Sequence, residues 1–160
     1  MNPPSLPASI AWSDPARRDA FAAWLAALAG PRRIVVASLR PASSDASFRR
    51  YLRADVEGGG SVVVMDAPPP QEDVRPFMHV AGLIERAGLH GPRVLEADPS
   101  HGFLLLDDLG NELYLAALQK AQGAGDAARA DALMRDAIAA LVVWQGKVPG
   151  EALPPYDDAL

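Results

Sequence analysis

The pattern of apolar and polar positions first predicts a helix near the start of the chain. Phe21, Leu25 and Leu28 recur at helical spacing, which places their side chains on one face. Ser13 stands where an N-cap is needed, because its hydroxyl can accept a hydrogen bond from a first-turn N–H group. Gly30-Pro31 is typical of a helix end. We therefore expect a helix that begins just after Ser13 and ends near Gly30.

Five later segments are predicted as strands. Apolar runs or alternating apolar and polar residues mark them, and they are residues 32–39, 48–56, 61–65, 93–97 and 103–106. A loop is expected at 41–47, between the first two strands. Gly58, Gly59 and Gly60 predict a hairpin turn before the third strand, because glycine adopts positive φ freely. The third strand has a continuous apolar run that ends at Met65, the pattern of a strand buried on both faces.

Helical patterns return at about residues 73–87, 112–122 and 126–145. The prolines at 68–70 exclude regular structure just before the first of these helices. The order is therefore helix, three strands, helix, two strands and two helices. It predicts an α+β fold with a five-stranded antiparallel sheet and an embedded helix, arranged like the small lobe of a protein kinase and followed by connecting helices.

Composition narrows the function classes. The net charge is −5 and the sequence pI is about 5.1, which argues against nucleic acid or an anionic membrane as the main partner. The chain has no cysteine, so a disulfide framework and a cysteine-ligated metal are both excluded. It lacks a signal-peptide pattern at its start and any run of about 18 apolar residues. We expect a cytoplasmic protein with no membrane partner.

Several short segments, in this order and spacing, carry a resemblance to a known family. They are Ser43–Tyr51, Val64–Pro69, Glu72-Asp73, Pro76-Phe77 and Gly102–Gly110. Together they resemble the aminoglycoside phosphotransferase family, and more narrowly its bacterial branch of amino-sugar kinases in cell-wall recycling. Members of that branch phosphorylate N-acetylmuramate and N-acetylglucosamine at the anomeric hydroxyl. The resemblance covers nearly all of residues 12–160.

The resemblance implies a nucleotide-binding lobe at residues 12–110, preceded by an extended lead-in at 1–11. Residues 111–160 would form a helical linker and the start of a second lobe. That lobe is expected to follow residue 160 and to supply the catalytic aspartate and the magnesium ligands that phosphoryl transfer needs. The implied enzyme is an ATP-dependent phosphotransferase with Mg²⁺ as cofactor and an amino sugar as acceptor. The chain alone is expected to be inactive.

The polar loop at 43–47 is the phosphate site that the resemblance implies. Its backbone N–H groups and hydroxyls can surround phosphate oxygens, although a polar turn of this kind can also be purely structural. Arg49 can add a charge-assisted hydrogen bond, and a solvated arginine on a strand is the alternative. The candidate phosphate-binding residues are Ser43, Ser44, Asp45, Ala46, Ser47 and Arg49.

The last predicted strand and the turn after it resemble the fifth strand and hinge of such kinases. Adenine recognition there uses backbone groups, and the candidates are the Asp107 carbonyl and the Leu109 N–H. Leu106 and Val63 would line the faces of the ring. An ordinary buried strand that ends in a turn is the alternative and needs no ligand. The adjacent carboxylates Asp107 and Asp108 point to opposite sides of a strand, so we expect no shared metal site.

The sequence departs from the family at an ion pair. Most related kinases have a lysine on the third strand that contacts the α- and β-phosphates and pairs with a glutamate on the following helix. Met65 and Phe77 stand at these positions, and an apolar pair can pack. Arg49, Arg50 or Arg53 is the hypothesised substitute for the lysine. The carboxylates expected in the next loop are Asp66, Glu72 and Asp73, of which the last is expected to cap the following helix.

Two other functions stay open. The loss of both the lysine and the glutamate also fits a non-catalytic nucleotide-binding or regulatory module. Within the enzyme class, the alternative is another hydroxyl acceptor such as an aminoglycoside or choline, because acceptor pockets in the family lie mainly in the second lobe. The oligomeric state is not predicted.

Overall fold

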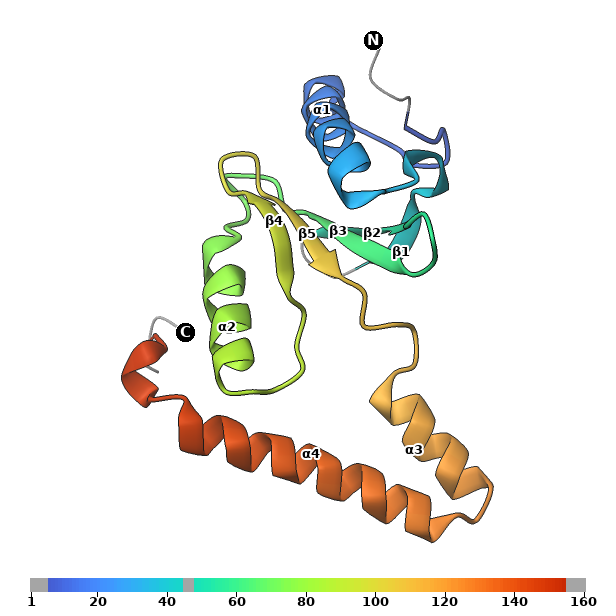
Figure 1. Cartoon of the computed structure of the whole chain (residues 1–160), viewed down its shortest axis with the longest axis vertical. Helices are drawn as coiled ribbons and strands as arrows, with labels where there is room; N and C mark the ends of the chain where they lie inside the picture. Colours follow the sequence, from blue (N-terminus) through green and yellow to red (C-terminus); the bar gives the residue numbers. More distant parts are fainter. Residues whose placement is uncertain (1–5, 45–47, 155–160) are drawn as a thin grey trace. The chain divides into compact units, whose positions relative to one another are not determined.

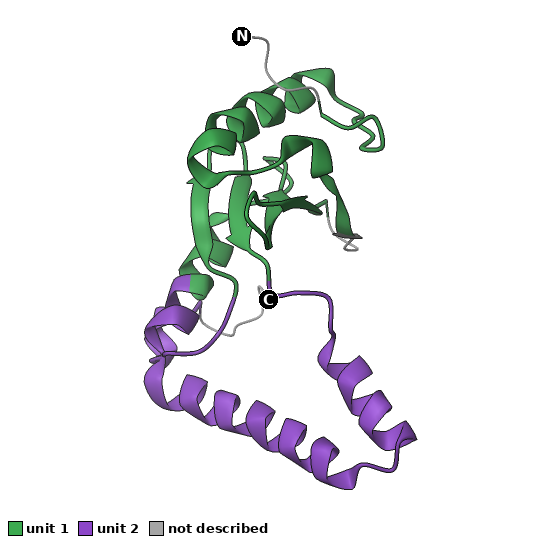
Figure 2. Ribbon diagram, turned by 45° about the vertical axis from the view of Figure 1, so that its right-hand side comes forward, with its two compact units in different colours: residues 1–81, 92–108 green, residues 82–91, 109–160 purple. Residues whose placement is uncertain are grey.

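The computed structural model describes residues 6–44 and 48–154. The chain divides into two compact units, coloured separately in Figure 2. The first comprises residues 1–81 and 92–108, and the second comprises residues 82–91 and 109–160.

An antiparallel sheet forms the centre of the first unit (Figure 1). Its strands are β1 (Arg40–Ser44), β2 (Arg50–Asp55), β3 (Ser61–Asp66), β4 (Val94–Asp98) and β5 (Phe103–Asp107). Their order across the sheet is β1-β2-β3-β5-β4, with antiparallel neighbours throughout. The helix α2 (Arg75–Arg86) is inserted between β3 and β4 in the chain. The predicted α+β class and five-stranded sheet are confirmed.

The helix α1 (Pro15–Arg32) covers one face of this sheet. Phe21 and Leu25 of α1 are fully buried against a core that includes Val64 and Phe103. The Phe21 and Phe103 rings meet edge to face with centroids 5.4 Å apart, a favourable geometry for an aromatic pair. Side chains of alternate strand residues point to the other face, where Met65 belongs to a second cluster. Strand β3 therefore contributes to two cores, as its apolar run predicts.

The ends of α1 differ from the prediction. Asp14, rather than Ser13, is the N-cap, and its Oδ1 accepts a hydrogen bond of 2.9 Å from the Ala16 N–H. The helix continues through Gly30-Pro31 to Arg32, and Arg33 closes it in the left-handed conformation at φ 57°. A proline in the last turn removes only one intrahelical hydrogen bond, so the helix can extend past it.

The first strand was predicted in the wrong place. Within residues 32–39 only Ile34 makes a β-bridge, to Val56, and residues 36–38 form a 3₁₀ helix. Strand β1 begins at Arg40 and includes Pro41, in the segment predicted as a loop. The apolar run that suggested a strand is instead buried beneath α1, where Ile34 and Val36 join the core. Pro41 is tolerated because β1 lies at the edge of the sheet and carries a register shift there.

The remaining elements lie close to their predicted bounds. The hairpin glycines all have positive φ, at 93°, 110° and 87°, as a tight turn requires. Helix α2 begins two residues later than expected, and the Asp73 Oδ1 accepts a hydrogen bond of 3.0 Å from the N–H of its first residue, Arg75. Gly88 follows the helix at φ 79°. Asp73 therefore contributes to capping, in line with the prediction.

The second unit contains the helices α3 (Tyr114–Gly123) and α4 (Ala127–Lys147) and the short 3₁₀ helix η2 (Gly150–Ala152). The Tyr114 hydroxyl donates a hydrogen bond to the Leu133 carbonyl, which joins α3 to α4. An apolar stripe on α4 is more than half exposed at Ile138, Leu141 and Val142. Across residues 6–44 and 48–154, no helix is long and apolar enough to cross a membrane.

Candidate functional site

The predicted adenine-lining residues lie together on the sheet face opposite α1. Val63 and Leu106 are register partners on β3 and β5, and both contribute to the cluster that contains Met65. Leu106 is buried and Val63 is half-buried, so Val63 offers the accessible apolar surface of the pair. The geometry provides an apolar strand face on which a flat ring can pack.

The predicted adenine-edge residues lie at the end of β5. The Asp107 carboxylate accepts hydrogen bonds from the N–H of Arg93 at 2.6 Å and from its Nε at 2.9 Å. Its own backbone N–H donates to the Arg93 carbonyl at 3.1 Å. The side chain of Asp107 is therefore engaged, which leaves the proposed contact to its backbone carbonyl. Leu109 follows the strand, belongs to the second unit and is 52% exposed.

The predicted phosphate residues are only partly described. Asp45, Ala46 and Ser47 lie outside the described residues. Ser43 and Ser44 are the last two residues of β1, with Tyr51 and Arg50 as their register partners. The described part of this candidate site is therefore the end of β1, together with Arg49 just before β2.

A partly buried ion pair lies just before β2. Arg49 Nε donates to Glu72 Oε2 at 2.8 Å, and the Phe48 N–H donates to Glu72 Oε1 at 3.2 Å. Glu72 is 9% exposed and Arg49 is 35% exposed. The hydrogen bond to Glu72 raises the pKa of Arg49 above its usual value, and desolvation opposes this rise. Tyr51 also hydrogen-bonds Arg49 and packs on the Met65 cluster, so Arg49 belongs to the same side as the adenine-lining pair.

A second ion pair lies on the same face, near the end of β5. Arg53 is the register partner of Val63, and its Nη2 donates to Asp108 Oδ1 at 2.9 Å. The Ser61 hydroxyl donates to Asp108 Oδ2 at 2.5 Å. The side chains of Arg53 and Asp108 are 13% and 7% exposed. Asp107 and Asp108 thus engage different partners, and no three histidine, aspartate or glutamate side chains of the described chain are grouped to hold a metal.

Met65 and Phe77 pack in one apolar cluster. They stand where the resemblance implies a lysine and a glutamate. Met65 is 1% exposed and Phe77 packs against the same group of side chains. The position that holds a charge in related kinases is therefore filled by packed apolar side chains, as expected.

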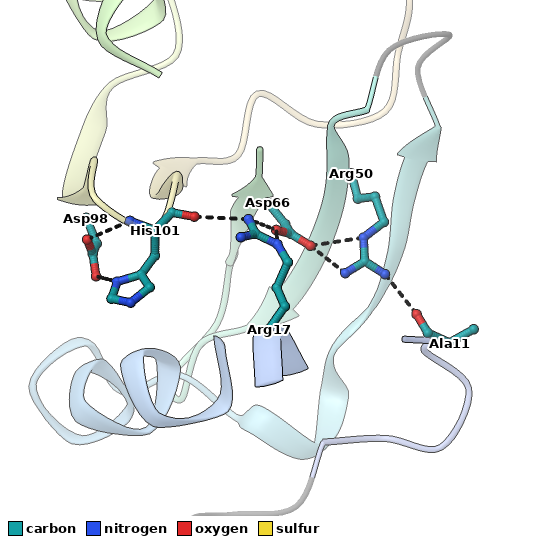
Figure 3. Close-up of polar contacts among 6 residues, drawn as sticks. All are labelled: Ala11, Arg17, Arg50, Asp66, Asp98 and His101. Carbon is teal, nitrogen blue, oxygen red and sulfur yellow. Dashed lines mark hydrogen bonds and ion pairs between the residues drawn. The ribbon is translucent and has the colours of Figure 1, made fainter. Parts of the chain in front are cut away.

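Sequence reasoning missed a charged cluster on the α1 face, drawn in Figure 3. Asp66 is 1% exposed and accepts from Arg17 Nε at 2.8 Å and from Arg50 Nε at 3.0 Å. Arg17 Nη2 also donates to the His101 carbonyl at 3.0 Å, and Arg50 Nη1 donates to the Ala11 carbonyl at 2.8 Å. The prediction of Asp66 as a loop carboxylate is wrong, because it is the last residue of β3.

This cluster borders a cavity of about 880 Å³ on the α1 side. Trp12, Phe48 and His101 line it together with the two arginines, and the Arg50 guanidinium lies 4.1 Å from the Trp12 ring centroid. None of the predicted adenine or phosphate residues of the described chain lines this cavity. The cavity therefore lies on the α1 side of the sheet, whereas the predicted adenine-lining residues Val63 and Leu106 lie on the other side.

The turn between β4 and β5 carries a pH-dependent contact. Asp98 Oδ1 accepts from the Ser100 hydroxyl at 2.5 Å, and Asp98 Oδ2 lies 2.8 Å from His101 Nδ1. Desolvation is the largest influence and raises the pKa of Asp98, but the hydrogen bonds from Ser100 and His101 together lower it below its usual 3.8.

We therefore expect Asp98→Asn to reduce stability near pH 6 and to have less effect near pH 3. A lowered carboxyl pKa stabilises the fold above the unfolded-state pKa, and this contribution is lost as the pH falls through the folded-state pKa. Urea denaturation of both chains at the two pH values measures the difference. A difference that grows toward pH 3 would contradict the expectation.

Residues 38–158 match the phosphotransferase enzyme family. The N-acetylmuramate/N-acetylglucosamine kinase of Pseudomonas aeruginosa is 52% identical over 124 residues, which cover 78% of this chain and 34% of that protein. The protein of the same name from Pseudomonas putida is 45% identical over 152 residues, 93% of this chain and 40% of that protein. The one from Neisseria meningitidis is 43% identical, with 72% and 33% covered. The chain thus spans between a third and two fifths of the length of these curated relatives.

Proposed function

Since the chain belongs to the phosphotransferase enzyme family, we propose that it is the ATP-binding lobe of a sugar kinase whose acceptor is N-acetylmuramate or N-acetylglucosamine. The observation that carries this proposal is the sheet itself. Its apolar face at Val63 and Leu106 lies on the same side as the Arg49–Glu72 ion pair, and Arg49 comes two residues after the predicted phosphate segment 43–47 in the sequence. The names of the relatives support the choice of acceptor.

In this proposal, adenine packs against Val63 and Leu106. Its edge is held by the Asp107 carbonyl and the Leu109 N–H. The phosphates lie against residues 43–47 and Arg49. Residues 12–110 form the nucleotide lobe, and residues 111–160 lead toward a second lobe.

Magnesium is assigned to no residue of this chain. The described residues hold no group of three carboxylates or imidazoles that fits a cation. From the resemblance to such kinases, we propose that the magnesium ligands and the catalytic aspartate belong to the part of the relatives' length that this chain does not span. The chain by itself then binds nucleotide without transferring phosphate.

Calorimetric titration of the 160-residue chain with ATP and with adenosine tests the proposal. We expect both to bind, and Val63→Ala to weaken both by roughly 3- to 10-fold, the effect of about one apolar contact. Val142→Ala is the matched control, because Val142 is 62% exposed on α4 of the second unit. Failure of ATP to bind, or equal affinities in the wild type and Val63→Ala, would contradict the proposed site.

The packed pair Met65 and Phe77 favours a second candidate, a non-catalytic nucleotide-binding module. The intact mass of the protein from its source separates the two. A mass near twice 16.9 kDa or more favours the kinase, and a mass of 16.9 kDa favours the module. For a longer protein, a panel of N-acetylmuramate, an aminoglycoside and choline as phosphate acceptors identifies the substrate.

A further inference from the structure

We propose that Glu72 is a positioning residue that holds Arg49 as the phosphate-binding cation of this lobe. The inference rests on the proposed function and deepens it, because it assigns to this ion pair the role that a lysine and a glutamate have in related kinases. It concerns only described residues: Phe48, Arg49, Tyr51 and Glu72.

Glu72 is itself held in place from several directions. Its backbone N–H donates to the Pro68 carbonyl at 3.0 Å. Its two carboxylate oxygens accept from consecutive residues, Oε1 from the Phe48 N–H and Oε2 from Arg49 Nε. A single carboxylate thus fixes both the backbone before β2 and the direction of the guanidinium. This contact can orient the guanidinium, because Nε is part of its rigid plane.

Glu72 is more buried than Arg49, as expected if Glu72 orients Arg49 and Arg49 contacts the ligand. Glu72 is 9% exposed, so its charge depends on Arg49 for compensation. Arg49 is 35% exposed, so a ligand in solution can reach its guanidinium. The hydrogen bond that Arg49 donates to Glu72 also raises the pKa of Arg49. The pair presents its positive member outward and its negative member inward.

Arg50 and Arg53, the two arginines of β2 that were also hypothesised to replace the lysine, fit this role less well. Arg50 points to the α1 face, where it binds Asp66. Arg53 is 13% exposed and pairs with Asp108 at the far end of β2. Arg49 and Arg53 both lie on the adenine side, but Arg49 is the more exposed of the two and the nearer in sequence to the predicted phosphate segment 43–47.

The test compares ATP with adenosine, which lacks the phosphates, on four forms of the chain: wild type, Arg49→Gln, Glu72→Gln and the double variant. Glutamine at 72 keeps an oxygen for the Phe48 N–H and removes the charge that orients Arg49. We expect each single variant to weaken ATP roughly 10-fold or more, the usual effect of losing a charge-assisted hydrogen bond. Adenosine affinity stays unchanged, and the double variant is no weaker than Arg49→Gln, because Glu72 acts through Arg49.

Asp73→Asn is the matched control, since it removes a charge from the neighbouring residue. Asp73 forms an exposed ion pair with Arg75, and asparagine can keep the capping hydrogen bond from the Arg75 N–H. This variant leaves the ratio of the two affinities unchanged. Glu72→Asp retains the charge and should keep more of the ATP affinity than Glu72→Gln.

The outcomes separate the inference from the proposed function. If wild-type chain binds neither ligand, the proposed function is wrong. If it binds both and Arg49→Gln leaves the ratio unchanged, Arg49 does not contact phosphate and the inference is overturned. Equal losses of ATP and adenosine in Glu72→Gln, with a lowered melting temperature, would show a merely structural role. If Glu72→Gln does not fold, Arg49→Gln and Glu72→Asp supply the comparison.

Discussion

Asp66→Asn is expected to lower the unfolding free energy of the chain by about 2–4 kcal/mol. The asparagine keeps the shape of the side chain but removes the charge shared by two guanidinium groups, at a carboxylate that is 1% exposed. Breaking a fully buried pair costs about 3–5 kcal/mol. The expected loss is smaller because 38% of the Arg50 side chain is exposed and screened by water. Urea denaturation followed by tryptophan fluorescence measures it.

The control for this prediction is Asp55→Asn. Asp55 pairs with Arg40 at the surface, where the two side chains are 52% and 46% exposed. An exposed pair contributes about 0.2–1 kcal/mol, so this variant should remain close to the wild type. If the two variants lose similar amounts, the cluster around Asp66 does not stabilise the fold as its burial indicates.

The second large effect is expected from Gly102→Ala. Gly102 has φ 72°, and a Cβ there would lie 1.8 Å from the Ala67 carbonyl oxygen. The Ala67 N–H also donates to the Gly102 carbonyl at 2.9 Å, so the two backbones cannot separate without losing that bond. Left-handed strain costs about 1–3 kcal/mol and a forced overlap in a packed region about 1–3 kcal/mol more. We expect a loss of about 3–5 kcal/mol in unfolding free energy, or a chain that does not fold.

Gly125→Ala separates these two contributions. Gly125 has φ 67° but no atom within 4 Å of its Cβ position, so the substitution introduces the backbone strain alone. Thermal and urea unfolding of both variants give the comparison. Equal losses would mean that the Ala67 backbone moves aside easily, contrary to the expectation.

Local sequence patterns were sufficient to predict those elements whose structure depends mainly on their own residues. The three hairpin glycines and the apolar run of β3 predicted a turn and a two-sided strand, and both were found. The pattern failed at residues 32–39, because an apolar run predicts burial and does not by itself specify a strand. There the burial comes from α1, a tertiary contact that no local pattern contains.

The candidate site shows the same division. Val63 and Leu106 share a face because they are register partners on β3 and β5, a pairing that the period of each strand does not specify. Their contact with adenine stays a prediction. The contact between Arg17 and Asp66 joins residues 49 positions apart. The helical pattern predicts only that Arg17 faces solvent, so it could not predict this ion pair. Arg50 and Asp66 are register partners across one hairpin, so that pair could have been predicted from the sequence. The ion pair of Glu72 depends on the path of a loop, which the sequence leaves open.

The apolar stripe on α4 has a consequence for every titration and denaturation curve proposed above. Side chains such as Ile138 and Val142, at 56% and 62% exposure, offer one chain molecule a surface on which another can associate. If association occurs, mass action makes the midpoint of unfolding rise with protein concentration. Stabilities of two variants are then comparable only at matched micromolar concentrations, and a dilution series on the wild type shows whether this condition applies.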